Sequence, residues 1–257
     1  MNRLESLLEK SGAAGSAASS LGQDLDLTDF GAATARKAAV DHPATVFGPV
    51  HYERNYAYPL IVWLHGAGQN ERQLVKIMPL VSLRNYVAVA PRGVRRADAT
   101  AAARQAFTWT EHGGDFDLAQ QRVFELIDEA RRQYHVARHR IFLAGADVGG
   151  TTALRLALAH PDRFAGVLSL GGTFPAGRSP LARLVEARRL PIFLAYGRED
   201  AAFSDDAVES QLKLFHAGGL QVTLRQYPGA AGIAPQMLSD MDRWTMDLVT
   251  GAPARAC

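Results

Sequence analysis

The sequence predicts an α/β fold in which helices cover both faces of a mostly parallel central sheet. Short, continuously apolar segments bounded by Gly and Pro alternate with longer segments whose apolar residues recur every three or four positions. Strands that are apolar on both sides are typical of a parallel sheet buried between two layers of helices. The chain has 257 residues, 47% of them hydrophobic and 21% charged, which is enough for a sizeable core.

The N-terminal segment differs from the rest of the chain. A short amphipathic piece with Leu4, Leu7 and Leu8 precedes residues 11–20, which are small and polar and offer nothing large to bury. We therefore expect residues 1–43 to be an arm and flexible linker, residues 44–250 to form the α/β domain, and residues 251–257 to be a tail.

The predicted elements follow from these patterns in chain order. The strands are Leu60–Leu64, Tyr86–Ala90, Ile141–Ala144, Gly166–Leu170, Pro191–Ala195 and Leu220–Gln226. The helices are Glu71–Leu80, Leu118–Tyr134 with Asp117 as its cap, Thr151–Ala159, Asp205–Ala217 and Gln236–Val249. Two long connections, 94–116 and 173–190, are expected to rise over the carboxyl ends of the strands, where such sheets bind ligands.

Charge and composition exclude several classes of function. The 28 Lys and Arg residues nearly balance 26 Asp and Glu residues, so the net charge of +2 indicates no nucleic-acid partner. No apolar run is long enough for a membrane span, and the first residues do not resemble a signal peptide, so we expect a cytoplasmic protein. The single cysteine, Cys257, excludes an internal disulfide and a thiolate metal cluster.

No metal or cofactor is expected either. His135 and His139 have a helical spacing that zinc sites use, but no acidic third ligand is evident, and exposed side chains are the simpler interpretation. The sequence gives no sign of the oligomeric state.

The chemically informative segment is a glycine-rich turn after the third predicted strand. Residues 145–150, Gly-Ala-Asp-Val-Gly-Gly, join this strand to the helix that follows it. Gly145 and Gly149 remove side chains where strand and helix come close, which leaves Asp147 in a strained position at the helix start. A second turn, residues 65–68 (His-Gly-Ala-Gly), follows the first predicted strand.

With these two turns the sequence resembles the α/β-hydrolase fold and, within it, the phospholipase/carboxylesterase group of small serine esterases. The resemblance covers residues 59–249. In such enzymes the nucleophile is the serine of G-x-S-x-G, followed in the chain by an acid and a histidine, and two backbone N–H groups stabilise the oxyanion. The resemblance implies Asp147 at the nucleophile position, Asp200 at the acid position and Ala231 at the histidine position. It places the oxyanion donors on the backbone of Ala67 and Val148.

Two of the three triad positions therefore depart from the pattern of the group. An aspartate at this turn serves as nucleophile in haloalkane dehalogenases and epoxide hydrolases of the same fold, but those enzymes still need the histidine to activate water. The last histidine of the chain is His216, in a helix before the final strand. His65 and His112 are the candidates for a surrogate base, and together with Gly66 and Trp109 they are candidates to line the pocket.

Simpler interpretations stand beside the catalytic ones. Asp147 could be an anion that caps the helix after the serine was lost, because a carboxylate is favoured at a helix N-terminus. Asp200 could make local turn hydrogen bonds. The leading hypothesis is a hydrolase relative that is non-catalytic or severely impaired in ester hydrolysis and keeps a pocket for a small ester or acyl ligand. The alternatives are an active hydrolase of esters, haloalkanes or epoxides with Asp147 as nucleophile and an unrecognised base, and a protein-interaction module on a hydrolase scaffold.

Overall fold

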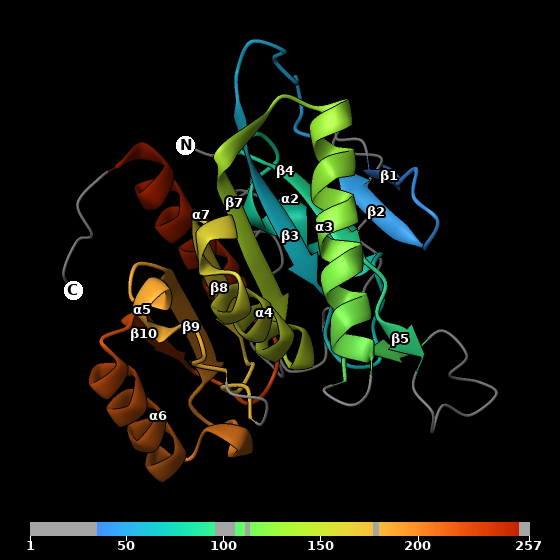
Figure 1. Ribbon diagram of the computed structural model, residues 1–257. Coiled ribbons are helices and arrows are strands. Elements are labelled where there is room, and N and C mark those ends of the chain that lie inside the picture. The colour runs from blue at the N-terminus through green and yellow to red at the C-terminus, as the bar shows by residue number, and fades with distance from the viewer. Residues whose placement is uncertain (1–34, 96–105, 111–113, 177–179, 252–257) are drawn as a thin grey trace, which may run out of the picture.

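The computed structural model describes residues 35–95, 106–110, 114–176 and 180–251. Within these ranges an eight-stranded sheet has the order β1-β2-β4-β3-β7-β8-β9-β10 (Figure 1). From β4 to β10 each neighbouring pair is parallel, whereas β1 and β2 add to one edge in antiparallel fashion. The predicted mostly parallel sheet is confirmed.

The elements have the following bounds. The strands are β1 (Ala35–Lys37), β2 (Ala44–Phe47), β3 (Tyr58–Leu64), β4 (Val87–Pro91), β7 (Val136–Ala146), β8 (Gly166–Leu170), β9 (Pro191–Gly197) and β10 (Gln221–Tyr227), with β5 (Val94–Arg95) and β6 (Phe107–Thr108) forming a separate two-stranded ribbon. The α-helices are α2 (Gln73–Val81), α3 (Asp115–Gln133), α4 (Val148–Ala159), α5 (Leu184–Ala187), α6 (Asp205–Gly218) and α7 (Pro235–Thr250), with 3₁₀ turns at Pro161–Arg163 and Ala201–Phe203.

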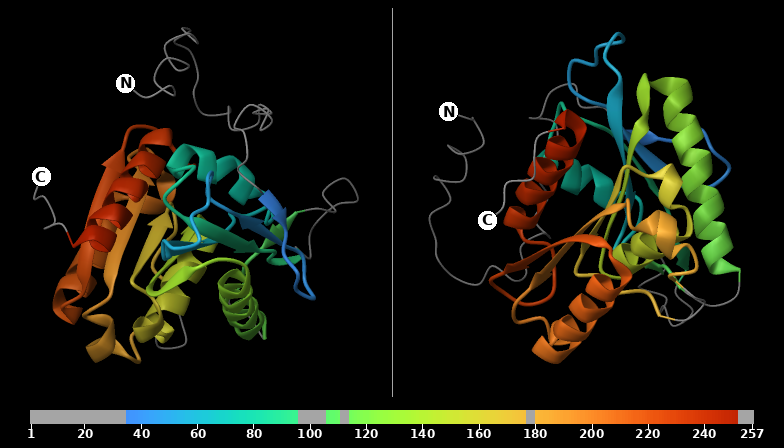
Figure 2. Two further views of the ribbon diagram at one scale, coloured as in Figure 1. Left: turned by 90° about the horizontal axis from the view of Figure 1, so that it is seen from above. Right: turned by 60° about the vertical axis from the view of Figure 1, so that its left-hand side comes forward.

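Helices cover both faces of the sheet, as predicted. Along β3 the side chains alternate between two apolar cores, with Leu60 and Val62 in one and Ile61 and Trp63 in the other. The first core is closed by α3, α4, α5 and α6, and the second by α2 and α7. Figure 2 shows these layers, with α2 and α7 on the side of the sheet opposite α3 and α4.

The sheet begins at Ala35, nine residues before the predicted start of the α/β domain at residue 44. Residues 35–37 were assigned to the arm, but they form β1, which pairs with β2 in the register Ala35↔Phe47 and Lys37↔Thr45. The three residues of β1 are exposed and include two cations, so no apolar run marks the strand. β1 is held by backbone hydrogen bonds to β2, and such pairing leaves no pattern in the sequence of the strand.

Two further expectations are corrected. Asp117 does not cap α3, because the helix begins at Asp115 after Gly114 and places Asp117 inside its first turn. Strand β10 is not buried on both faces, because it is the edge strand of the sheet and much of it is partly exposed. Among the described residues no helix combines the length and the apolar character that crossing a membrane requires.

Candidate active site

Asp147 lies at the sharp turn between β7 and α4. Its backbone has φ 49° and ψ −127°, and the one other non-glycine residue with positive φ in the described ranges is His51. This conformation is costly for a residue with a side chain. The Asp147 N–H donates to the Leu170 oxygen at 2.8 Å, and the Thr151 N–H donates to the Asp147 oxygen at 3.1 Å. The sheet and the helix together hold the strained turn, and the carboxylate side chain is exposed.

The two flanking glycines are required by close backbone packing. A Cβ at Gly145 would lie 2.5 Å from the carbonyl group of Gly149, and a Cβ at Gly149 would lie 2.3 Å from the Leu64 oxygen and 2.4 Å from the His65 oxygen. Real Cβ atoms essentially never approach other atoms this closely. The interpretation of these glycines as positions of close strand–helix contact is confirmed.

The second turn, after β3, contacts the first through a hydrogen bond. The backbone N–H of Ala67 donates to Oδ2 of Asp147 at 3.1 Å, across 80 residues of sequence. Gly66 lies beside the same contact, because a Cβ at Gly66 would be 3.7 Å from the Cβ of Asp147. The structure therefore brings together three residues that the sequence assigned to one site, and Val148 follows them as the first residue of α4.

The Asp147 side chain makes no capping hydrogen bond to the helix that it precedes. The N-cap position of α4 is Asp147, but its side chain accepts no capping hydrogen bond from that helix. The carboxylate instead accepts from the Ala67 amide of a different loop, so a capping hydrogen bond is not the role of this side chain.

Gln73 orients the loop that carries Ala67, although no sequence pattern singles it out. Its Oε1 accepts hydrogen bonds from the Gly66 N–H at 3.2 Å and from Trp63 Nε1 at 2.9 Å. These two hydrogen bonds connect the first turn of α2 to the end of β3. A lone glutamine at a helix start carries no motif, so only the three-dimensional contact reveals this role.

His65 is a structural residue rather than part of a pocket lining. The Gly93 N–H donates to His65 Nε2 at 2.9 Å, and Nδ1 lies 2.9 Å from the Gly66 oxygen. Because a backbone N–H only donates and a carbonyl only accepts, the ring must be neutral with its proton on Nδ1. The side chain is fully buried, and this burial lowers its pKa from 6.5 to about 4. With both nitrogens engaged, His65 is not a surrogate base.

This buried neutral histidine predicts acid sensitivity. Between pH 6.5 and pH 4 the unfolded chain binds a proton at His65 that the folded chain does not, so the free energy of unfolding falls by about 3 kcal/mol as the pH drops through this window. The measurement is urea denaturation at pH 7, 5.5 and 4. The variant His65→Gln should be less stable at pH 7 but lose less stability on acidification. Equal pH slopes in the two proteins would contradict the assignment.

The other pocket-lining candidates also need revision. Trp109 is buried, and its Nε1 donates to the His65 oxygen at 2.9 Å, so it supports the loop from beneath instead of lining an open pocket. His112 lies outside the described residues. The neighbouring segment does reach the loop, since Gly68 N–H donates to the Phe107 oxygen and Phe107 N–H to the Gln69 oxygen.

Asp200 and Ala231 lie on two adjacent loops that follow β9 and β10. The Glu199 N–H donates to the Gly229 oxygen at 3.0 Å, and a Cβ at Gly197 would lie 2.2 Å from the Ala230 oxygen. Oδ1 of Asp200 accepts from the Ala202 N–H at 3.0 Å, which is the local turn bond that the simpler interpretation predicted. Ala231 is exposed. Both loops are at the carboxyl ends of parallel strands, the edge where Asp147 also lies.

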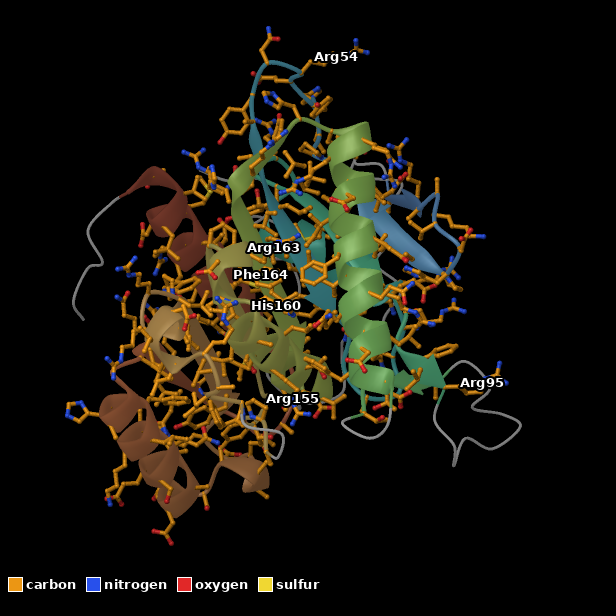
Figure 3. All side chains as sticks on the ribbon, viewed as in Figure 1. Arg54, Arg95, Arg155, His160, Arg163 and Phe164 are labelled. Atoms are coloured by element: carbon orange, nitrogen blue, oxygen red, sulfur yellow. The ribbon has the colours of Figure 1, made fainter. Side chains whose placement is uncertain are left out.

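The remaining described histidines near these elements do not reach the turn. His216 is exposed in the last turn of α6. His160, labelled in Figure 3, follows the last residue of α4, whereas Asp147 precedes the first, and Nε2 of His160 lies 2.6 Å from Gln120 Oε1. His135 and His139 are exposed, as predicted.

Arg155 is a further residue that the sequence did not single out. It is buried on α4, its guanidinium lies 5.8 Å from the centre of the Phe116 ring, and it donates to the Ala176 oxygen (Figure 3). It thus joins α4 to the start of α3 and to the connection after β8. The sequence signal was only an arginine in an otherwise apolar helix.

The sheet order, the strained turn after β7 and the amide-bearing loop after β3 define an α/β-hydrolase fold. The chain belongs to the phospholipase/carboxylesterase family, whose model matches residues 49–247.

Individual relatives agree with this assignment. A protein from Nocardia uniformis subsp. tsuyamanensis that is named as an esterase, NocK, is 40% identical over 86 residues, covering 34% of this chain and 23% of its own length. A bifunctional acetylxylan esterase/xylanase from Neocallimastix patriciarum is 26% identical, covering 66% of this chain and 24% of its own. This chain thus spans about a quarter of the length of these curated relatives. The solved carboxylesterase of Mesorhizobium loti superimposes with a TM-score of 0.64 at 18% identity, covering 85% of this chain and 99% of its own.

Proposed function

We propose that this chain is a phospholipase/carboxylesterase family member that is non-catalytic or severely impaired in ester hydrolysis and that binds small ester or acyl ligands. The observation that carries the proposal is the hydrogen bond from the Ala67 N–H to the Asp147 carboxylate. In this interpretation Asp147, Asp200 and Ala231 occupy the positions of the nucleophile, the acid and the histidine.

The Asp147 carboxylate should slow ester hydrolysis. The transition state places negative charge on the former carbonyl oxygen, and backbone N–H groups at an oxyanion site stabilise that charge. The Ala67 N–H is such a donor, but it already donates to the Asp147 carboxylate. The negative charge of that carboxylate also repels the oxyanion of the transition state. Loss of one oxyanion donor costs roughly 10²- to 10³-fold in rate.

The site also lacks a proton acceptor at the histidine position. Ala231 presents a methyl group, and no histidine follows His216 in the sequence. A positioned general base contributes roughly 10²- to 10⁴-fold. Both deficits act on the same step, so hydrolysis should be slow even if a substrate binds.

The test is hydrolysis of p-nitrophenyl acetate and butyrate. We expect the wild-type rate to stay near the rate of the uncatalysed reaction in buffer and to be the same in Asp147→Ala. An esterase rate that is clearly above buffer and disappears in Asp147→Ala would overturn the proposal.

The rival function, with Asp147 as a covalent nucleophile, is tested separately. Attack of the carboxylate oxygen on a haloalkane carbon would release halide and leave an alkyl ester on Asp147, and attack on an epoxide would leave a hydroxyalkyl ester. Intact-mass spectrometry after incubation with 1-chlorohexane or styrene oxide detects either product. We expect no adduct that is present in the wild type and absent in Asp147→Ala.

Ligand binding is tested without turnover. Saturation-transfer NMR with phenyl acetate should give a signal with the wild-type protein, since an unreacted ester persists during the measurement. Absence of that signal at millimolar ligand would remove the binding part of the proposal.

A further inference from the structure

A groove outside the candidate active site lies between helix α2 and the β1–β2 strand pair. Its volume is about 640 Å³, and none of its lining residues belongs to the turns around Asp147. Phe47, Val75 and Pro79 provide an apolar floor, and Lys37 and Arg72 lie on its exposed rim.

Strand alternation shows which side chains face the groove. Arg36 is among the residues that line the groove, but its guanidinium reaches the opposite face, where it donates to Gln133 and Tyr134 at the end of α3. Its neighbour Lys37 must therefore point toward α2. The paired residue Thr45 lines the groove on the same face, as does Phe47, which belongs to the core beneath α2.

The groove carries a net positive charge. Its one acidic lining residue, Glu71, is buried and accepts two hydrogen bonds from Arg92, both 2.6 Å long. Although burial alone would raise it, these bonds hold the pKa of Glu71 below its ordinary value, so the pair is neutral as a unit. Lys37 and Arg72 remain as charges that face an occupant.

The groove also adjoins an open sheet edge. β1 is the terminal strand of the sheet, and among the described residues no strand pairs with its outer side. Exposed edge strands are usually covered or blunted, because their backbone groups pair readily with another extended segment. An extended occupant would satisfy this edge and the apolar floor together.

We propose that residues 24–30 of this same chain, Asp-Leu-Asp-Leu-Thr-Asp-Phe, dock in the groove. These residues lie outside the described ranges, and the chain enters the structure at Ala35, which lines the groove. The segment has three aspartates, and no lysine or arginine occurs between residues 11 and 35, so its charge is opposite to that of the rim. Leu25 and Leu27 alternate with Asp24 and Asp26, the period of a strand with one apolar side.

The connection is short enough to favour this occupant over a separate molecule. Residues 31–34 are four small or hydroxyl residues, Gly-Ala-Ala-Thr, and hairpin loops commonly have two to five residues. A tethered segment has an effective concentration of about millimolar for its site. A second copy or an acidic peptide from another protein would need that concentration in solution.

The experiment uses the full chain with Cys257→Ser as background and a short bis-maleimide cross-linker. One variant adds Leu27→Cys and Val75→Cys, which places a thiol in the groove floor. The matched control adds Leu27→Cys and Gln121→Cys instead. Residue 121 is exposed on α3, which covers the other face of the sheet. We expect the intramolecular cross-link to form about tenfold faster in the first variant, since docking concentrates residue 27 at the groove.

Charge reversal provides the second arm of the experiment. The tenfold difference between the two cross-linking rates should disappear when the segment carries Asp24→Lys, Asp26→Lys and Asp29→Lys together. It should return when Lys37→Glu and Arg72→Glu are added, because the charges are then opposite again. Both rim residues are exposed, so these changes leave the core intact, which circular dichroism checks. Equal cross-linking rates in the two cysteine pairs would overturn the proposal. So would cross-links found only between molecules, or a preference that charge reversal does not change.

Discussion

Replacing Asp147 by Ser and Ala231 by His in one protein should raise esterase activity well above that of the wild type. With p-nitrophenyl acetate we expect the double variant to exceed the wild type by at least about 10²-fold, because it gains a nucleophile and a general base and frees an oxyanion donor. The turn that would hold the serine keeps its strained backbone, and the Ala67 amide already points at the side chain of residue 147. The loops with Asp200 and residue 231 are in contact.

The single variants are the controls for this gain. Asp147→Ser lacks a base and Ala231→His lacks a serine, so each should remain within about tenfold of the wild type, as expected for residues that act as a unit. Adding Asp200→Asn to the double variant should lower the new activity if that carboxylate orients the imidazole. A folded double variant with no gain would show that the pocket itself has drifted from that of a serine esterase.

Substituting Gly149 by Val should prevent stable folding. The new Cβ would lie 2.3 Å from the oxygen of Leu64, the last residue of β3, and 2.4 Å from the His65 oxygen, which accepts a hydrogen bond from buried Trp109. Strand β3 cannot move aside, because it pairs with β4 and β7. We expect a loss of more than about 4 kcal/mol in the free energy of unfolding.

Soluble yield and urea denaturation measure this effect, with Gly114→Ala as the matched control. Gly114 precedes α3 with φ −81°, and a Cβ there would meet no atom within 4 Å, so the change should cost less than about 1 kcal/mol. A Gly149→Val protein as stable as the wild type would mean that the strand and helix are not in close contact at this turn.

The central strands and helices could be predicted because burial determines their pattern. Strand Gly166–Leu170 was predicted with its observed bounds, since it is apolar, buried and bounded by glycine and an irregular segment. β1 could not be predicted, because its three exposed residues are held by backbone pairing with β2. The exposed side of β10 was missed for a related reason, since strand order is not visible in local composition.

The candidate site could be predicted in position but not in contacts. The glycines around Asp147 and the loop of Ala67 were located by spacing, because close packing excludes side chains there. The hydrogen bond between them depends on how the strained turn directs one carboxylate, so the sequence favoured a helix cap instead. His65 looked chemically available, and only its two backbone partners show that it is not.

The start of α2, where Gln73 lies, contributes both to the candidate active site and to the groove beside β1 and β2. The carboxamide oxygen of Gln73 accepts a hydrogen bond from Gly66, next to the Ala67 amide, while Arg72 and Val75, on either side of Gln73 in the sequence, line the groove. A shift of this helix turn would move both surfaces together. A molecule that binds one surface and displaces the turn must therefore change the affinity of the other, and linkage makes the two changes equal in free energy.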